Sequence, residues 1–192
     1  MDGRFQKRVQ RYGWDKAAIY YEDLWREQLE PAQTALLDFA DLVSGERVLD
    51  VACGTGLVAF RAASIVLPCG EVVGTDISEQ MIATACDIAR ARDIANTVFH
   101  RMDAEQLALD GASFDVALCA LGLMYVPHPE IALGEMHRET GDASVHRIAD
   151  RVNDDGVGQR QVNEARIEKI RRHLVNNSQC ARRSRQQFLD IA

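Results

Sequence analysis

Short apolar runs alternate with amphipathic segments through the middle of the chain. Four runs are almost continuously apolar, as in strands covered on both faces of a sheet; they are residues 47–51, 71–75, 97–101 and 114–120. The segments between and after them have apolar positions three or four apart, which predicts helices; they are residues 57–67, 78–92 and 130–138. This alternation predicts an α/β fold with a doubly wound, mostly parallel, Rossmann-like sheet.

The first 44 residues precede the first predicted strand and are mainly helical in pattern. Residues 1–13 are polar and basic, and we expect them to form a loose arm. Asp15 is placed to cap one helix, and Pro31 to occupy the first turn of a second. Aromatic residues are concentrated in this part of the chain; among them are Trp14, Tyr21 and Trp25. They either pack the helices onto the domain or form a lid over a ligand, and we take residues 1–44 as an N-terminal helical lid.

Composition narrows the class of protein. The 192 residues carry a formal net charge of −7, which argues against non-specific nucleic-acid binding. The five cysteines form no Cys-x-x-Cys pair, so reduced thiols fit better than a disulfide framework. The N-terminus lacks the apolar region of a signal peptide, and the longest apolar run is too short to span a membrane. We therefore expect a cytoplasmic protein.

Polar features stand at the carboxyl end of each predicted strand, where parallel α/β sheets bind their ligands. The first strand ends in Asp50 and a glycine loop, the second in Asp76, the third in Asp103, and the fourth in Cys119 and the residues after it. The loop and the 20-residue spacing to Asp76 leave an NAD-binding oxidoreductase possible. Acids beside the loop suit a pyrophosphate poorly and a cationic nucleoside well. S-adenosylmethionine, which carries a sulfonium and an ammonium group, therefore fits better.

Several motifs together carry a family resemblance. They are Val48-Leu49-Asp50-Val51-Ala52-Cys53-Gly54-Thr55-Gly56, Gly74-Thr75-Asp76-Ile77-Ser78 with Met81, Asp103-Ala104, Phe114-Asp115-Val116 and the opening Tyr12-Gly13-Trp14-Asp15. In these residues the chain resembles the class I S-adenosylmethionine-dependent methyltransferases, and within them the ubiquinone/menaquinone biosynthesis branch. The resemblance covers about residues 10–138 and makes residues 45–138 the S-adenosylmethionine-binding core.

The resemblance implies a role for each cofactor-binding residue. Asp50 would lie near the methionine ammonium. The backbone around the methionine part would come from Ala52, Cys53, Gly54 and Gly56. Asp76 would accept hydrogen bonds from both ribose hydroxyls, and Asp103, with the Ala104 amide, would bind the adenine edge. Apolar contacts would come from Ile77 and Met81 on the adenine and from Cys119 and Leu121 beneath the sulfonium.

The same resemblance implies methyl transfer to a small-molecule acceptor that is quinone- or phenol-like, or another metabolite. We assign no catalytic residue, because in-line alignment of acceptor and methyl group supplies most of what this chemistry needs. The nearest titratable candidates for a base are His100, His128, His137 and Tyr125. His100 is more plausibly structural, and we do not expect His128 to be catalytic. No Cys/His spacing suggests a metal site.

The composition changes abruptly after Arg138. Residues 139–192 are polar, with no continuous apolar strand, and we expect a helical or disordered tail in place of the family's last strands. An altered reading frame is one explanation and a divergent tail another. The alternative function is then a truncated S-adenosylmethionine-binding protein without turnover. The fourth strand would become an exposed sheet edge, through which a homodimer could form.

Overall fold

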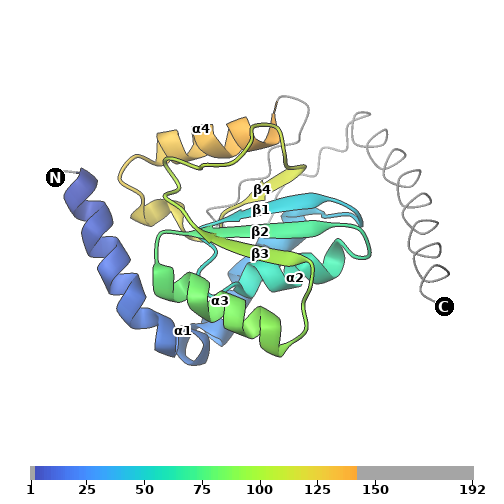
Figure 1. Cartoon of the computed structure of the whole chain (residues 1–192), viewed down its shortest axis with the longest axis horizontal. Coiled ribbons are helices and arrows are strands. Elements are labelled where there is room, and N and C mark those ends of the chain that lie inside the picture. The colour runs from blue at the N-terminus through green and yellow to red at the C-terminus, as the bar shows by residue number, and fades with distance from the viewer. Residues whose placement is uncertain (1–2, 142–192) are drawn as a thin grey trace.

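The computed structural model describes residues 3–141, and the predictions for the tail fall outside this range. Its elements, in chain order, are α1 (Gly3–Ala40), β1 (Arg47–Val51), α2 (Leu57–Ile65), β2 (Glu71–Asp76), α3 (Glu79–Ala91), β3 (Thr97–Arg101), β4 (Val116–Leu118), the short 3₁₀ helix η1 (Leu123–Tyr125) and α4 (Pro129–Thr140). Figure 1 shows the sheet between α4 on one side and α2 and α3 on the other.

The four strands form one parallel sheet in the order β3-β2-β1-β4. This order confirms the predicted α/β class and places β1 between β2 and β4. The strand after residue 114 is shorter than expected, because only Val116–Leu118 pairs with β1. Since all strands run the same way, their carboxyl ends meet at one edge of the sheet.

Both faces of the sheet are buried, as the continuous apolar runs predicted. Val48 and Val116 lie in a cluster with α2, α3 and the end of α1. Leu49 and Ala117 point to the other face and pack with Met136 of α4. Because neighbouring residues of a strand alternate between faces, β1 contributes to both clusters and holds the two layers together.

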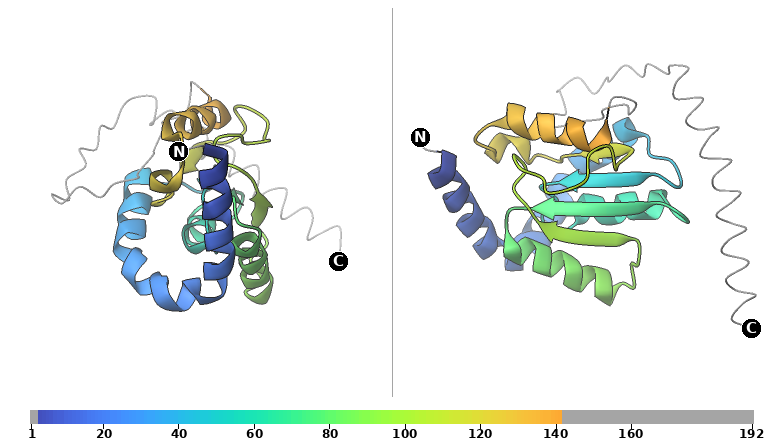
Figure 2. Two further views of the ribbon diagram at one scale, coloured as in Figure 1. Left: turned by 90° about the vertical axis from the view of Figure 1, so that its left-hand side faces the viewer. Right: turned by 45° about the horizontal axis from the view of Figure 1, so that its top comes forward.

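The N-terminal region differs from the prediction. Residues 3–13 are helical and not a loose arm, and the two expected helices form one continuous element with Pro31 inside it. Figure 2 shows that this helix bends strongly between its two halves, so the chain stays helical while it changes direction. Proline is the usual cause of such a bend, because it lacks one backbone donor. Asp15 caps no helix, since it lies inside α1 and accepts hydrogen bonds from α3.

The state of the cysteines also departs from expectation at one position. Cys53, Cys86 and Cys119 are free thiols, as predicted. Cys69 is disulfide-bonded, so the prediction of reduced thiols is wrong there. Cys69 follows Pro68 in the turn before β2 and is partly buried.

β4 is the outermost strand on its side of the described sheet. This position agrees with the lack of a recognisable fifth strand, and dimerisation through the edge stays a prediction. Among residues 3–141, no helix is both long and apolar enough to cross a membrane.

Candidate functional site

A cavity of about 170 Å³ lies at the carboxyl edge of the sheet, beneath α1. Its floor comes from the ends of β1, β2 and β4 and the loop after β3, and its cover comes from α1 and η1. Eight of the predicted site residues line it: Ala52, Gly54, Asp76, Ile77, Met81, Asp103, Ala104 and Leu121. The other four, Asp50, Cys53, Gly56 and Cys119, are not among its lining residues.

The loop after β1, which contributes Ala52 and Gly54 to the cavity wall, has an unusual backbone. Gly54 and Gly56 have φ angles of 56° and 91°, and Ala52 adopts the same left-handed region at 56°. Glycine takes these angles without strain, whereas alanine does so at a cost. A Cβ on Gly56 would lie 2.8 Å from the ring of Phe60, so this position also needs glycine for space. Gly56 thus shapes the loop from behind and makes no part of the cavity wall.

Asp76 is the polar centre of the cavity floor. Its Oδ2 accepts the Gly54 amide at 2.9 Å, and its Oδ1 accepts the Ser78 amide at 2.8 Å. Burial raises the pKa of the carboxyl, and these amides act in the opposite direction. The Ile77 amide also hydrogen-bonds this carboxyl, so the carboxylate is held in place by backbone donors and keeps acceptor capacity for a ligand.

Asp50 lies behind the cavity wall and is fully buried at the end of β1. Neither of its oxygens has a hydrogen-bond partner among the described residues. Desolvation, reinforced by the nearby Asp76, raises the pKa of this carboxyl to about 8; the Ala59 amide, which lies nearby without completing a hydrogen bond, opposes the shift. Two buried carboxyls so close together favour a cationic ligand, because a buried charge needs a partner of opposite sign.

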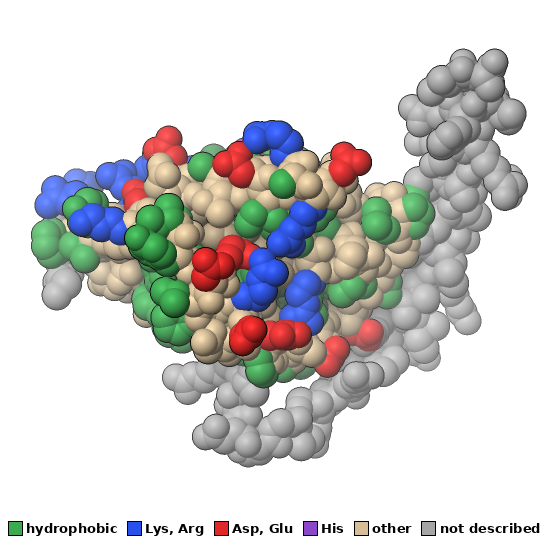
Figure 3. All heavy atoms as spheres, turned by 90° about the horizontal axis from the view of Figure 1, so that it is seen from below, with side chains coloured by type: hydrophobic (Ala, Val, Ile, Leu, Met, Phe, Trp, Pro, Cys, Tyr) green, Lys and Arg blue, Asp and Glu red, His purple; other side chains and the backbone are tan. Residues whose placement is uncertain are grey.

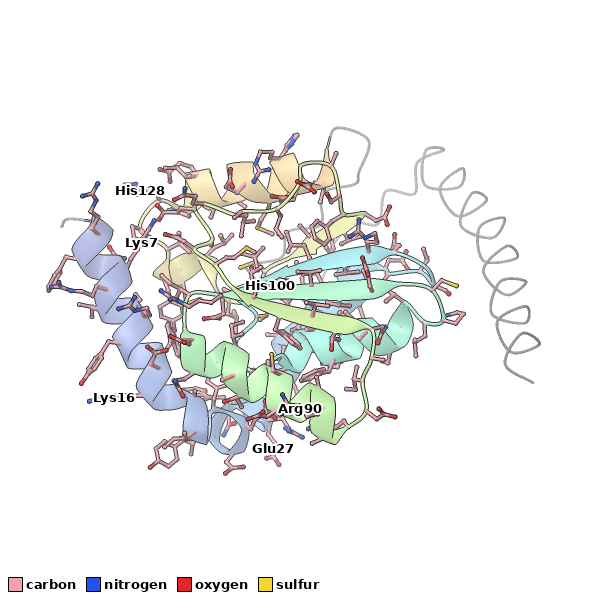
Figure 4. All side chains as sticks on the ribbon, viewed as in Figure 1. Lys7, Lys16, Glu27, Arg90, His100 and His128 are labelled. Atoms are coloured by element: carbon pink, nitrogen blue, oxygen red, sulfur yellow. The ribbon has the colours of Figure 1, made fainter. Side chains whose placement is uncertain are left out.

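Asp103 is already engaged at the other end of the cavity. Its Oδ2 lies 2.7 Å from Lys7 Nζ, and its Oδ1 accepts the Glu105 amide at 3.0 Å. Lys7 also forms an ion pair with Glu105 at 2.7 Å. Burial would lower the pKa of Lys7, but the hydrogen bonds to both acids raise it. Figure 4 shows Lys7 directed from α1 toward the loops at this edge.

The pairing of Lys7 with Asp103 and Glu105 is not predicted from the sequence, in which Lys7 lies in the expected loose arm. The signal that could have revealed it is helical spacing: Lys7, Gln10, Trp14 and Tyr21 follow one another at intervals of three, four and seven and all line the cavity. The inner face of α1 is therefore one wall of the site, opposite the loops.

Aromatic side chains close the cavity from above. Trp14 meets Tyr21 and Tyr125 edge to face, with ring centroids 6.2 and 5.1 Å apart. Burial raises the pKa of Tyr21 to about 12, and the charge of Asp76 adds to the shift. The phenol is therefore neutral at physiological pH and can donate a hydrogen bond but cannot act as a base. Of the aromatic residues concentrated in the N-terminal region, Trp14, Tyr21 and Trp25 line the cavity, and their action as a lid stays a prediction.

Polar contacts fix α1 over the loops. Glu22 accepts a hydrogen bond from Thr55 of the glycine loop. Asp15 Oδ1 accepts from Ser78 Oγ at 2.6 Å and from the Gln80 amide at 3.3 Å. Ser78 itself caps α3, as predicted, by accepting the Met81 amide at 3.1 Å. The cover is thus joined to two of the loops that form the floor.

Replacing Asp15 with Ala should loosen this cover. Two charge-assisted hydrogen bonds are lost, each worth about 1.5–3 kcal/mol, so α1 opens more often while the sheet stays folded. We expect amide hydrogen exchange in residues 7–21 to become at least tenfold faster, with little change in β1 and β2. Asp23→Ala is the matched control, because Asp23 is exposed on α1. Equal amide hydrogen-exchange rates in the two variants would contradict the role of Asp15 in holding α1 over the loops.

Of the candidate bases named from the sequence, Tyr125 lines the cavity, and His100, His128 and His137 are not among its lining residues. His100 is exposed on β3. His128 precedes α4, and its Nδ1 lies 3.6 Å from Glu130. Within residues 3–141 there is no group of three or more His, Cys, Asp or Glu side chains that could hold a metal ion.

The fold and the cavity together define a Rossmann-like nucleotide-binding protein with an acidic ligand site. The residues fit S-adenosylmethionine in three respects: a carboxylate with acceptor capacity at the end of β2, a buried carboxyl behind the glycine loop that a cation would ionise, and apolar walls from Ile77 and Met81. A family model described as "Methyltransferase domain" matches residues 42–188. The chain belongs to this methyltransferase family, and its cofactor is accordingly S-adenosylmethionine.

The match to the family model extends beyond residue 138, where we had expected the resemblance to end. Among curated proteins, the chain is 34% identical over 126 residues to the aklanonic acid methyltransferase DauC of Streptomyces sp. (strain C5), which covers 66% of this chain and 57% of the relative. It is 41% identical over 103 residues to the ubiquinone/menaquinone biosynthesis C-methyltransferase UbiE of Ectopseudomonas mendocina (strain ymp), covering 53% and 40%. The chain thus spans about half the length of the curated relatives it matches.

Solved structures show the same fold. A SAM-dependent methyltransferase from Aquifex aeolicus superposes with a TM-score of 0.59 at 22% identity, covering 65% of this chain and 66% of that one. The [4+2]-cyclase SpnF superposes with a TM-score of 0.52 at 30% identity, covering 56% and 39%. The family membership favours a methyltransferase over the NAD-binding oxidoreductase considered from the sequence.

Proposed function

We propose that this chain binds S-adenosylmethionine in the cavity and transfers its methyl group to a small-molecule acceptor. The observation that carries the proposal is the buried, unpartnered carboxyl of Asp50 behind the cavity wall, beside Asp76, which lines the cavity next to Gly54. A cationic nucleoside supplies the missing positive charge and the hydroxyl donors. An anionic dinucleotide would place its phosphates against the same two acids.

Different residues of the site bind different parts of the ligand. Asp76 accepts the ribose hydroxyls through the acceptor capacity that the backbone amides leave. Ile77 and Met81 lie along the adenine, and Asp103 with Ala104 binds its polar edge. Cys53, Gly56 and Cys119 support the loops from outside the cavity wall, and Ala52, Gly54 and Leu121 contact the methionine part.

The bound cofactor supplies an activated methyl group on its sulfonium. The chain's own residues then have to align an acceptor and exclude water, and such alignment can contribute about 7–11 kcal/mol. We assign no general base, because Tyr21 is neutral, His100, His128 and His137 lie outside the cavity, and Tyr125 packs in the aromatic cluster against Trp14. The site therefore suits an acceptor that reacts without help or brings its own acidic proton.

The acceptor that fits the cover is planar and apolar. Trp14, Tyr21 and Tyr125 form one aromatic cluster against the cavity, and Trp25 and Leu29 extend its apolar wall. Flat rings stack favourably on such side chains. A quinone- or phenol-like compound is accordingly the acceptor class that we propose.

Calorimetric titration of the purified chain tests cofactor binding. S-adenosylhomocysteine and S-adenosylmethionine should bind with a one-to-one ratio, and NAD should neither bind nor displace them. Absence of heat together with absence of thermal stabilisation by either ligand would refute the assignment of the cavity.

Transfer of radiolabelled methyl from S-adenosylmethionine to a panel of quinones and phenols tests turnover. Label in an extractable acceptor supports the methyltransferase. Cofactor binding without any transfer would support the alternative, a binding protein without turnover, which is compatible with a chain about half as long as its curated relatives.

A further inference from the structure

The outer face of α1 carries an exposed apolar stripe, opposite the face that lines the cavity. Its members recur at helical spacing and are between 49% and 70% exposed: Phe5, Val9, Tyr12, Ile19, Tyr20 and Leu24. A surface helix normally turns one apolar stripe inward and a polar face outward. α1 has an inner face against the cavity and a second apolar stripe facing outward.

In the first half of α1 the exposed charges beside this stripe all have one sign. Between residues 3 and 20 the exposed charged side chains are Arg4, Arg8, Arg11 and Lys16, and exposed acids appear only farther along, at Asp23 and Glu27 beside Leu24. Two of them lie over rings of the stripe, with Arg8 5.6 Å from the centre of Phe5 and Lys16 4.5 Å from that of Tyr12. In Figure 3, green and blue side chains gather at the left end of the molecule, over this part of α1.

The single acid in this part of the helix faces the other way. Asp15 is bound to Ser78 and the Gln80 amide on the inner side of α1, so it does not neutralise the outer face. The whole chain has a formal charge of −7. A cluster of exposed cations beside apolar side chains therefore stands out against a protein that is acidic elsewhere.

We propose that the outer face of the first half of α1 is a docking surface for an anionic lipid bilayer. Helices with Lys and Arg beside exposed aromatic and aliphatic side chains lie in the plane of such a surface, with the apolar residues in the headgroup boundary. Each basic residue near an anionic surface contributes about 1 kcal/mol. The same face on a second copy of this chain would bring like charges together, which argues against a dimer through α1.

Docking in this orientation places the rim of the cavity near the bilayer. Gly3, at the start of α1, lies against Pro127 and His128. The neighbouring Met124 and Tyr125 of η1 are 60% and 41% exposed. If the proposed function holds, an apolar acceptor dissolved in lipid would enter beside η1. This consequence rests on the proposed function, but the docking itself does not.

Co-sedimentation of the full chain with vesicles tests the proposal without cofactor or acceptor. We expect binding to vesicles of phosphatidylcholine with 30% phosphatidylglycerol and at least tenfold weaker binding to phosphatidylcholine alone. Binding should also weaken as salt is raised, because exposed charges are screened. A failure of S-adenosylmethionine binding would refute the proposed function and leave this result unaffected.

Two pairs of variants separate the outer face from general surface effects. Arg11→Glu should weaken vesicle binding at least tenfold, whereas Arg90→Glu, an exposed arginine on α3, should leave it nearly unchanged. Ile19→Ser should weaken it several-fold, and Val98→Ser, an exposed apolar residue on β3, should not. Circular dichroism verifies that each variant is folded.

Absence of binding to anionic vesicles, or equal effects within each pair, would overturn the proposal. Concentration-dependent dimerisation that Ile19→Ser abolishes, without vesicle binding, would overturn it in favour of a second copy of the chain.

Discussion

Replacing Asp76 with Ala is expected to abolish detectable binding of S-adenosylmethionine and S-adenosylhomocysteine. The Asp76 carboxylate is held by backbone amides, among them those of Gly54 and Ser78, and keeps acceptor capacity for a ligand. Hydrogen bonds to charged groups contribute about 1.5–3 kcal/mol each, so losing two to the ligand weakens binding by at least about 100-fold. The variant also removes the acceptor for the Gly54 amide, and the glycine loop loses its connection to β2.

The matched control is Asp87→Ala on α3. Asp87 is exposed and pairs with Arg90 on the same helix. Its loss should therefore change ligand binding less than twofold. Titration calorimetry measures both variants, and thermal unfolding verifies that both are folded. Binding by the Asp76 variant within threefold of wild type would contradict the role of this residue.

The second large effect is a pH dependence that originates at Asp50. The pKa of this buried carboxyl is raised to about 8 in the folded protein, above its usual value of 3.8. Between these two values the folded state holds a proton that the unfolded state has released. Stability of the ligand-free protein should therefore fall as pH rises from about 4 to 8, by up to about 1.4 kcal/mol per pH unit for this group.

Asp50→Asn removes the titration and keeps the shape of the side chain. Denaturant unfolding at pH 5.5, 6.5 and 7.5 should show a flatter profile for this variant and a higher stability than wild type at pH 7.5. Asp76 also has a raised pKa, so part of the slope should persist. Parallel profiles for the two proteins would show that Asp50 is charged throughout this range.

The Asp50→Asn substitution should also weaken binding of the cationic ligand. Ionised Asp50 stabilises a positive charge and protonated Asp50 does not, so binding releases a proton below pH 8. Affinity of the wild type for S-adenosylmethionine should thus rise with pH between 6 and 7.5, by up to about tenfold per unit. In Asp50→Asn it should be weaker and nearly independent of pH. Isothermal titration in buffers of different ionisation enthalpy measures the proton release directly.

The parts of the fold that depend on residues close together in the sequence could be predicted from the sequence. Continuous apolar runs fixed the strands, and the acids at their ends placed Asp76 and Asp103 at one edge of a parallel sheet. The glycine loop was readable because left-handed φ angles and the space beside Phe60 demand particular residues at particular positions. Errors in this part concern boundaries, as for the strand after residue 114.

The N-terminal region could not be predicted in the same way. Its polar, basic start is compatible with a loose arm as long as the partners of Lys7 are unknown. Those partners, Asp103 and Glu105, follow β3 much later in the chain and meet Lys7 only when α1 lies across the sheet edge. Pro31 was equally ambiguous, because a proline can open a new helix or bend an existing one.

The sequence by itself determined the class of fold, the edge of the sheet that binds the ligand, and the acidic character of that edge. Only the tertiary structure decided that Asp50 is buried without a partner, that Asp103 is paired with a lysine, and that α1 covers the cavity with aromatic side chains. The physical reason is that strand patterns and loop conformations are local. Desolvation and the pairing of charges depend on which distant segments pack together.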